Sequence, residues 1–196
     1  METILYLIRH GETEWNKARR IQGHSDIMLN QLGTYQAGRL AAWYQTHPFD
    51  AIYASDLLRA QHTAHPLAIL KGINVQTHSS LRERCYGEWE GLTYEEIRER
   101  FQDADPEQSI YGIEPFLTMQ ERAYAALTEI VARHLGETVA VVSHGGFINS
   151  FLHYITEGKQ GTGISRIDNT GVSLIRFSLD RWEVLKVNDT AHLDHE

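Results

Sequence analysis

The chain has 196 residues, of which 42% are hydrophobic and 22% charged, the balance of an ordinary globular protein. A formal net charge of -8 argues against a broad nucleic-acid-binding surface, and no apolar run approaches the ~20 residues of a membrane span. The single cysteine, Cys85, excludes an internal disulfide and suits a reducing cytoplasm, and the N-terminus lacks the pattern of a secretory signal. We therefore expect one cytoplasmic domain, residues 1–196, that binds neither nucleic acid nor membrane.

Short apolar runs predict buried strands, and the longer amphipathic stretches between them predict helices. The expected strands cover residues 4–8, 50–54, 138–143 and, with a weaker pattern, 73–77, followed by an antiparallel pair at 171–178 and 182–187. The expected helices cover residues 31–46, 56–70, 93–101, 118–135 and 145–156. Alternating strands and helices predict an α/β fold, a three-layer α/β/α sandwich. Its mostly parallel central sheet carries one antiparallel strand.

The first strand ends abruptly in Arg9, His10 and Gly11. A buried strand does not continue easily into such residues, so they lie just past its carboxyl end, where open α/β sheets bind ligands. Arginine offers a planar fork of donors to phosphate or carboxylate, and histidine can act as nucleophile, acid or base near neutral pH. These three residues predict an anion-binding site, with a solvated strand end as the alternative.

Four ordered segments point to one family. Residues 7–16, with the sequence LIRHGETEWN, resemble the signature of the histidine phosphatase superfamily, which includes the cofactor-dependent phosphoglycerate mutases. Segments 55–64, 81–91 and 141–146 match that family in the order it needs. The resemblance covers nearly the whole chain. It implies a phosphoglycerate mutase-like fold and phosphoryl transfer through a phosphohistidine, and we expect neither a metal nor a cofactor.

The resemblance identifies His10 as the nucleophile, and Arg9, Arg59 and His144 as donors to the phosphate. Arg59 falls in the first turn of the helix after strand 50–54, and His144 directly follows strand 138–143. Three strand ends would thus converge on one anion. We also expect the second ring nitrogen of His10 to donate to a backbone carbonyl, which fixes the tautomer.

The candidate general acid is Glu83, which would protonate the leaving oxygen and then activate water. Repulsion from a nearby phosphate favours the neutral carboxyl, which suits this role. Glu12, Glu88 and Glu90 are the competing carboxylates, and the resemblance selects Glu83.

Further residues follow the family's positions around the phosphate and the substrate. Candidates from the resemblance are Asn16, Gln22, Gly23, Ser55, Arg84 and Tyr86, the last two as ligands of a substrate carboxylate. Trp15 and Trp89 are expected to serve packing, and His192 and His195 to form a solvated tail.

The core motifs serve a phosphatase and a mutase alike. The mutases carry a long basic insertion after the segment matching Glu83, whereas residues 102–117 here contain no Lys or Arg. Resemblance to the family also suggests that this segment closes over the site. We therefore expect a phosphomonoester hydrolase acting on a small phosphorylated metabolite. The alternatives are a phosphoglycerate mutase and a phosphoprotein-binding relative with weak catalysis. The sequence leaves open whether two chains form a homodimer.

Overall fold

In this computed structural model, residues 1–102, 105, 107 and 109–194 are described. Their strands form one sheet in the order β3-β2-β4-β1-β5-β6. The strands are β1 (Glu2–Arg9), β2 (Ala51–Ser55), β3 (Val75–His78), β4 (Thr138–Ser143), β5 (Val172–Ser178) and β6 (Arg181–Asp189). Strands β1 to β4 are mutually parallel, while β5 runs antiparallel to both of its neighbours, β1 and β6. The predicted mostly parallel sheet is confirmed.

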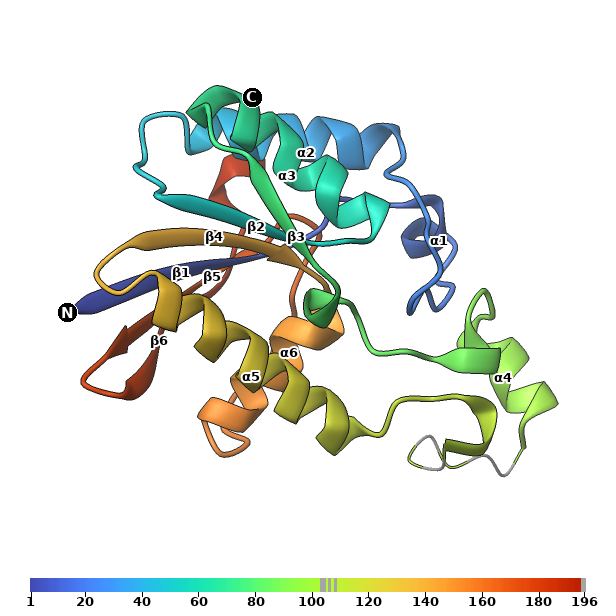
Figure 1. Ribbon diagram of the computed structural model, residues 1–196. Coiled ribbons are helices and arrows are strands. Elements are labelled where there is room, and N and C mark those ends of the chain that lie inside the picture. Colours follow the sequence, from blue (N-terminus) through green and yellow to red (C-terminus); the bar gives the residue numbers. More distant parts are fainter. Residues whose placement is uncertain (103–104, 106, 108, 195–196) are drawn as a thin grey trace.

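Helices cover both faces of this sheet (Figure 1). Helices α2 (Gln31–Trp43) and α3 (Leu58–Lys71) lie on one face, and α5 (Phe116–Arg133) and α6 (Gly145–Ile155) on the other. The short helices α1 (Glu14–Lys17) and α4 (Tyr94–Arg100) stand beyond the carboxyl ends of the parallel strands. The single-turn 3-10 helices are η1 (Ser79–Leu81), η2 (Gly87–Trp89), η3 (Ser109–Tyr111) and η4 (Ala191–Leu193). The three-layer α/β/α arrangement is confirmed, and none of the described helices is long and apolar enough to cross a bilayer.

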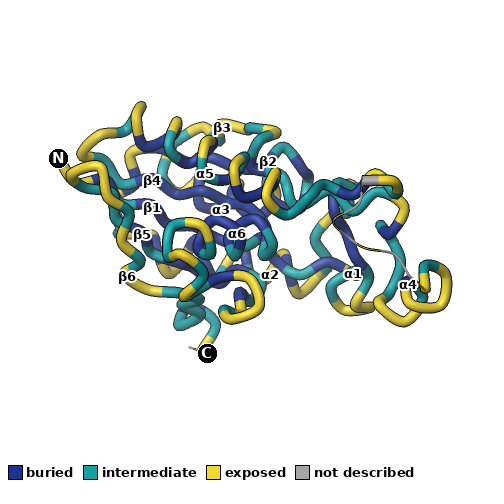
Figure 2. Tube along the Cα trace, turned by 90° about the horizontal axis from the view of Figure 1, so that it is seen from below, coloured by how far each residue is buried: buried dark blue, intermediate teal, exposed yellow. Residues whose placement is uncertain are grey.

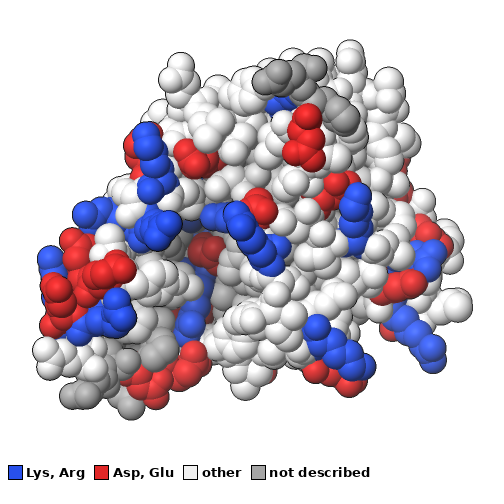
Figure 3. All heavy atoms as spheres, turned by 180° about the vertical axis from the view of Figure 1, so that it is seen from behind, with Lys and Arg blue, Asp and Glu red and all other residues white. Residues whose placement is uncertain are grey.

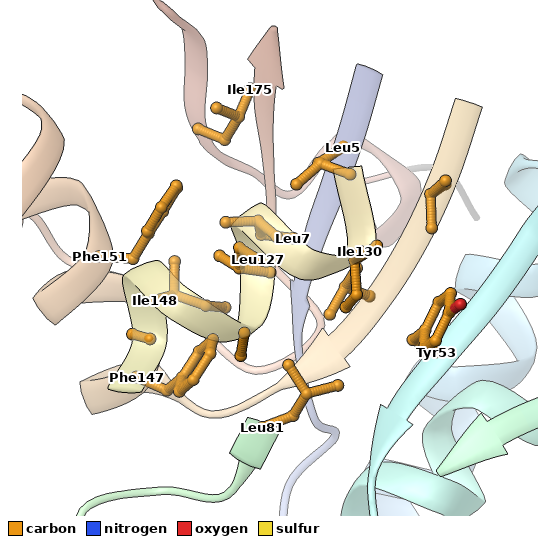
Figure 4. Packing of buried hydrophobic residues seen from close by; sticks show 14 of the residues in the cluster. Leu5, Leu7, Tyr53, Leu81, Leu127, Ile130, Phe147, Ile148, Phe151 and Ile175 are labelled. Atoms are coloured by element: carbon orange, nitrogen blue, oxygen red, sulfur yellow. The ribbon is translucent and has the colours of Figure 1, made fainter. Parts of the chain in front are cut away.

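The central strands are buried on both sides, which explains their unbroken apolar runs. Leu5 and Leu7 of β1 pack against α5 and α6 (Figure 4), while the alternating Tyr6 and Ile8 pack toward α2 and α3. Fully burying one such side chain contributes about 1.5–3 kcal/mol. The two cores therefore fix β1, and with it the residues that follow β1.

A third, smaller core lies away from the sheet. Ile21, Trp89, Ile97 and Ile113 pack together beside α1 and α4, and Figure 2 shows this buried patch apart from that of the sheet. The packing role expected for Trp89 is confirmed, since its side chain is buried in this cluster. Residues distant in sequence thus form a lobe beyond the carboxyl edge of the sheet.

The C-terminal segment departs from the prediction. His192, expected in a solvated tail, is only 1% exposed, so that prediction is wrong. Its carbonyl accepts a hydrogen bond from Arg39 of α2, and its Nε2 lies 2.8 Å from the Thr170 hydroxyl. These two contacts draw η4 onto the α2 side of the molecule. His195 lies outside the described residues.

Candidate active site

A cavity of about 340 Å³ opens at the carboxyl ends of the parallel strands. Figure 3 shows a hollow on one face of the molecule with basic side chains along its edge. Eight predicted site residues line the cavity: Arg9, His10, Asn16, Gln22, Gly23, Arg59, Glu83 and Tyr86. They come from segments far apart in sequence, and the fold brings them to one place.

His10 is held in a single tautomer. Its Nδ1 lies 2.7 Å from the Gly11 carbonyl oxygen, which can only accept, so Nδ1 carries the proton and Nε2 keeps its lone pair. This confirms the expected backbone hydrogen bond. Burial lowers the pKa of His10 well below its ordinary range, and the charges of Arg59 and Arg9 lower this pKa further. The imidazole is therefore neutral at physiological pH.

The backbone at His10 is also fixed from the other side. The His10 carbonyl accepts hydrogen bonds from the Asn169 amide at 3.0 Å and from the Thr170 N–H at 3.3 Å. Asn169 and Thr170 precede β5, which is the antiparallel neighbour of β1. The turn before β5 thus positions the residue that follows β1.

Two arginines with buried guanidinium groups face His10. Arg59, the second residue of α3, donates to the carbonyl oxygens of Ser25 at 2.8 Å and Gly23 at 2.7 Å. Arg9 donates to the Ile167 carbonyl at 2.7 Å. Burial lowers the pKa of both arginines, that of Arg59 to about 10, so both stay charged at neutral pH. Within the described part of the chain, neither Nε has a partner, which leaves a donor on each side chain for an anion.

His144 stands at the N-terminus of α6, fully buried, with its ring centroid 5.2 Å from that of His10. Burial lowers its pKa well below the ordinary range, and the charge of Arg59 adds to this effect. Neither ring nitrogen has a hydrogen-bond partner among the described residues. Buried polar groups normally have partners, so this ring is ready to bind one more group beside His10.

Glu83 is oriented by backbone donors. Its carboxylate accepts hydrogen bonds from the N–H groups of Gly146 and Arg84, both at 2.9 Å. Its carbonyl accepts from the Arg122 guanidinium at 3.1 Å. A Cβ on Gly146 would lie 2.4 Å from Glu83 Oε1, so only glycine permits this approach of α6. The contact places a carboxylate in the cavity with His10.

Two of the competing carboxylates are engaged elsewhere. Glu12 accepts from the Asn30 amide at 2.8 Å. Glu90 accepts from the backbone N–H of His24 and from the Ser25 hydroxyl, at 2.9 and 2.6 Å. Through these hydrogen bonds Glu12 and Glu90 stabilise the loops around the site.

The amide side chains and Gly23 complete one wall. Gln22 Oε1 accepts from the Thr13 hydroxyl at 2.9 Å, and Asn16 Oδ1 accepts from the Thr13 N–H at 3.1 Å. Gly23 has φ +51°, and a Cβ there would lie 2.1 Å from a Glu90 oxygen. Glycine is therefore required at this turn.

Three of the predicted site residues, His144, Ser55 and Arg84, are not among the residues that line the cavity. The ring of His144 is buried, although it lies beside that of His10. Ser55 is fully buried in β2, where its hydroxyl accepts from the Leu57 N–H. Arg84 turns away toward the Glu114 carbonyl and the Glu107 carboxylate, so no cavity contact supports its expected role as a carboxylate ligand.

Segment 102–117 is described only in part, and its residues 103, 104, 106 and 108 lie outside the described residues. The expected closure over the site falls partly on them. Ile113 pairs with Tyr86, and α5 begins at Phe116. None of the segment's described residues lines the cavity; they brace the loop that follows Glu83.

Sequence reasoning missed part of the outer cavity. Its further lining residues are Trp15, Arg19, Arg20, Ile21 and Tyr94. Trp15 was expected only to pack, yet it also faces the cavity. The sequence did offer a signal for this part of the cavity. Arg19 and Arg20 are adjacent, and two neighbouring basic residues are unusual in an acidic chain.

Residues 5–190 match the family described as the histidine phosphatase superfamily, branch 1. The chain belongs to this superfamily. It is 35% identical to phosphoglycerate mutase-like protein 4 of Arabidopsis thaliana, over 97% of this chain and 86% of that protein. It is 33% identical to the metal-independent phosphoserine phosphatase of the same plant, over 97% and 83%. Among solved structures, Bacillus stearothermophilus YhfR superposes with a TM-score of 0.87 at 33% identity, covering 97% and 99% of the two chains.

These similarities identify the protein as an enzyme, a histidine phosphatase. The cavity with its neutral histidine and buried arginines lies where the sequence motifs of this superfamily come together in the fold. Both mutase-like and phosphatase relatives resemble the chain.

Proposed function

We propose that this histidine phosphatase hydrolyses small phosphomonoesters through a phosphohistidine on His10. The observation that carries the proposal is the state of the His10 ring: neutral, with Nδ1 bound to the Gly11 carbonyl and Nε2 free to attack. The charged groups of Arg9 and Arg59 lie beside it to stabilise the transferring phosphoryl group.

The reaction has two steps. In the first, His10 Nε2 forms a bond to phosphorus while the bond to the alcohol oxygen breaks, and the Glu83 carboxyl gives that oxygen its proton. In the second, the Glu83 carboxylate takes a proton from water, whose oxygen attacks phosphorus and displaces His10. Inorganic phosphate leaves, and both residues return to their starting states. His144 supplies a donor to a phosphate oxygen throughout.

The charge compensation is assigned to arginines, so we propose that no metal and no cofactor takes part. A phosphoryl group carries its charge on equatorial oxygens, which guanidinium groups bind well. The similarity to a relative named as metal-independent supports this assignment.

Hydrolysis is favoured over mutase chemistry by the segment after Glu83. A mutase must retain its dephosphorylated product, which requires basic residues and a closed site. Residues 102–117 supply neither Lys nor Arg, and Arg84 is held by Glu107 outside the cavity. With 3-phosphoglycerate and a bisphosphoglycerate primer, phosphate release should outpace formation of 2-phosphoglycerate. Efficient isomerisation with little phosphate would make the enzyme a mutase.

Trapping the covalent intermediate tests the central step. Wild-type enzyme quenched during turnover should carry base-stable, acid-labile phosphate. His10→Ala should lose on the order of 10³-fold or more in kcat, because a nucleophile and its supporting groups act as a unit. His62→Ala, on the exposed face of α3, is the matched control. Wild-type turnover in His10→Ala would refute the assignment, and absence of turnover in wild type would favour a phosphoprotein-binding role.

The cysteine content bears on the cellular setting. The single Cys85 is a free thiol, which suits a reducing compartment. We propose a cytoplasmic enzyme folded as one domain, with a small phosphorylated metabolite as its partner.

A further inference from the structure

Glu83 lies between η1 and η2, in a stretch that belongs to no helix or strand. The backbone groups of this stretch therefore depend on side chains for their hydrogen bonds. Side chains bind each of the four carbonyls from Ser80 to Glu83. The Ser143 hydroxyl donates to the carbonyl of Leu81 at 2.7 Å. The other three carbonyls all accept hydrogen bonds from one residue, Arg122 of α5.

The guanidinium of Arg122 is fully engaged. Its Nη1 donates to the carbonyls of Ser80 and Arg82 at 2.8 and 2.9 Å, and its Nη2 donates to that of Glu83 at 3.1 Å. Its Nε and Nη2 also donate to the two carboxylate oxygens of Glu114, both at 2.8 Å. These five hydrogen bonds match the five N–H groups of a guanidinium. A lysine, with three N–H groups on one nitrogen, could not make all of them.

Glu114 extends this arrangement to the residues that follow Glu83. Its N–H donates to the Cys85 carbonyl at 2.9 Å, and its carboxylate accepts from the Cys85 N–H at 3.3 Å. Its carbonyl accepts from the Arg84 guanidinium at 2.7 Å. The side chains of Arg122 and Glu114 are only 23% and 13% exposed, so solvent screens this ion pair little. The pair therefore fixes the backbone on both sides of Glu83.

The same arginine also faces the helix that binds the Glu83 carboxylate. Its guanidinium lies 5.9 Å from the ring centroid of Phe147 in α6, and the neighbouring Gly146 N–H donates to Glu83. A second group, His24 Nε2, lies 2.9 Å from the Glu83 carbonyl. A general acid must stay within hydrogen-bond reach of the oxygen that it protonates. A shift of this backbone would move the carboxyl group away from that oxygen.

We propose that Arg122, paired with Glu114, is a positioning residue for proton transfer by Glu83. The inference rests on the proposed phosphatase function, in which Glu83 is the acid. Arg122 does not line the cavity, so it acts on the reaction through the Glu83 backbone and not by binding substrate. A misplacement of about 1 Å can slow a reaction about 10²-fold. Loss of Arg122 therefore slows the step that needs the proton and leaves substrate binding in place.

Leaving groups of different basicity test this role. In Arg122→Met, single-turnover phosphorylation of His10 by glycerol 2-phosphate should slow about 10–100-fold, with KM nearly unchanged. With p-nitrophenyl phosphate the loss should be much smaller, because that leaving group needs little protonation. Arg133→Met breaks the exposed α5 pair with Glu129 and should keep wild-type rates with both substrates. Arg122→Lys keeps the charge and some of the hydrogen bonds, so it should show the same selective loss at a smaller size, even if Arg122→Met does not fold.

A double variant separates positioning from general damage to the fold. Adding Arg122→Met to Glu83→Gln should cause no further loss with glycerol 2-phosphate, because no proton is left to position. Equal losses for the two substrates in the Arg122 variants, or a full further loss in the double variant, would overturn the proposal. Absence of phosphohistidine in wild type would instead refute the phosphatase function itself. If phosphohistidine forms but Glu83→Gln slows both substrates equally, Glu83 is not the acid and Arg122 does not position one.

Discussion

Acid should destabilise this protein well above the pH at which carboxylates titrate. His10, His144 and His192 are 3%, 0% and 1% exposed, and burial lowers the pKa of each, that of His192 to about 4. In the unfolded chain the same rings titrate near pH 6.5. Below pH 6.5 the unfolded state therefore binds more protons than the folded state, and the free energy of unfolding falls as the pH drops.

The size of this effect follows from the proton difference. A histidine that titrates at 6.5 when unfolded and stays neutral when folded lowers the free energy of unfolding by about 2 kcal/mol between pH 7 and 5. Three such residues give at most about 6 kcal/mol, a large part of a typical stability of about 5–15 kcal/mol. The loss begins near pH 6.5 and, for His192, ends near its folded pKa of about 4. The hydrogen bond from Arg82 lowers the pKa of Asp56 below 3.8. The stability that this ionised carboxylate contributes is therefore lost only at still lower pH.

Urea titrations at pH 7, 6 and 5 measure the effect, and His192 is the residue to vary because it lies outside the cavity. His192→Gln keeps an N–H that can donate to Thr170, but it cannot titrate. Between pH 7 and 5 this variant should lose about 2 kcal/mol less than the matched variant His62→Gln, at an exposed position of α3. If both variants lost the same free energy of unfolding, the pKa of His192 would not be lowered in the folded state.

Three further predictions concern the reaction and its supports. Glu83→Gln cannot deliver a proton, so single-turnover phosphorylation of His10 should slow about 10²–10⁴-fold with an alkyl phosphate and much less with an activated aryl phosphate; equal losses would exclude Glu83 as the acid. Gly23→Ala should lower the thermal midpoint and weaken vanadate inhibition, because its Cβ would lie 2.1 Å from a Glu90 oxygen at φ +51°; wild-type values for both would contradict the strain. Activity should survive exhaustive chelation, and a loss that a divalent ion restores would show that arginines do not suffice.

Much of the inner site was predictable because it follows directly from the strands. The strand at 138–143 has the predicted bounds, since Val139 to Val142 are all fully buried. A polar residue that follows such a strand has to lie at its carboxyl end, as His144 does. The same argument places His10 after β1.

The outer site depends on pairings that no local pattern encodes. Arg84 was expected to contact substrate, but its guanidinium binds Glu107 and the Glu114 carbonyl, and it does not line the cavity. The sequence around His192 predicts a polar tail, because the contact that buries this residue is with the distant Thr170. Arg19 and Arg20 are adjacent and chemically identical, so only tertiary contacts show that Arg20 pairs with Glu96 while Arg19 has no ion pair among the described residues.

The order of strands in the sheet has a consequence for synthesis on the ribosome. The strand that leads into His10 is synthesised more than 100 residues before either of its neighbours: Ile4 pairs with Thr138 of β4, and Ile8 with Val172 of β5. Until both have left the exit tunnel, β1 is an apolar segment with open edges, the kind of segment that aggregates or recruits a chaperone. Pairing of β1 with β4 and β5, and not the appearance of the signature motif, is then the event that assembles the candidate site.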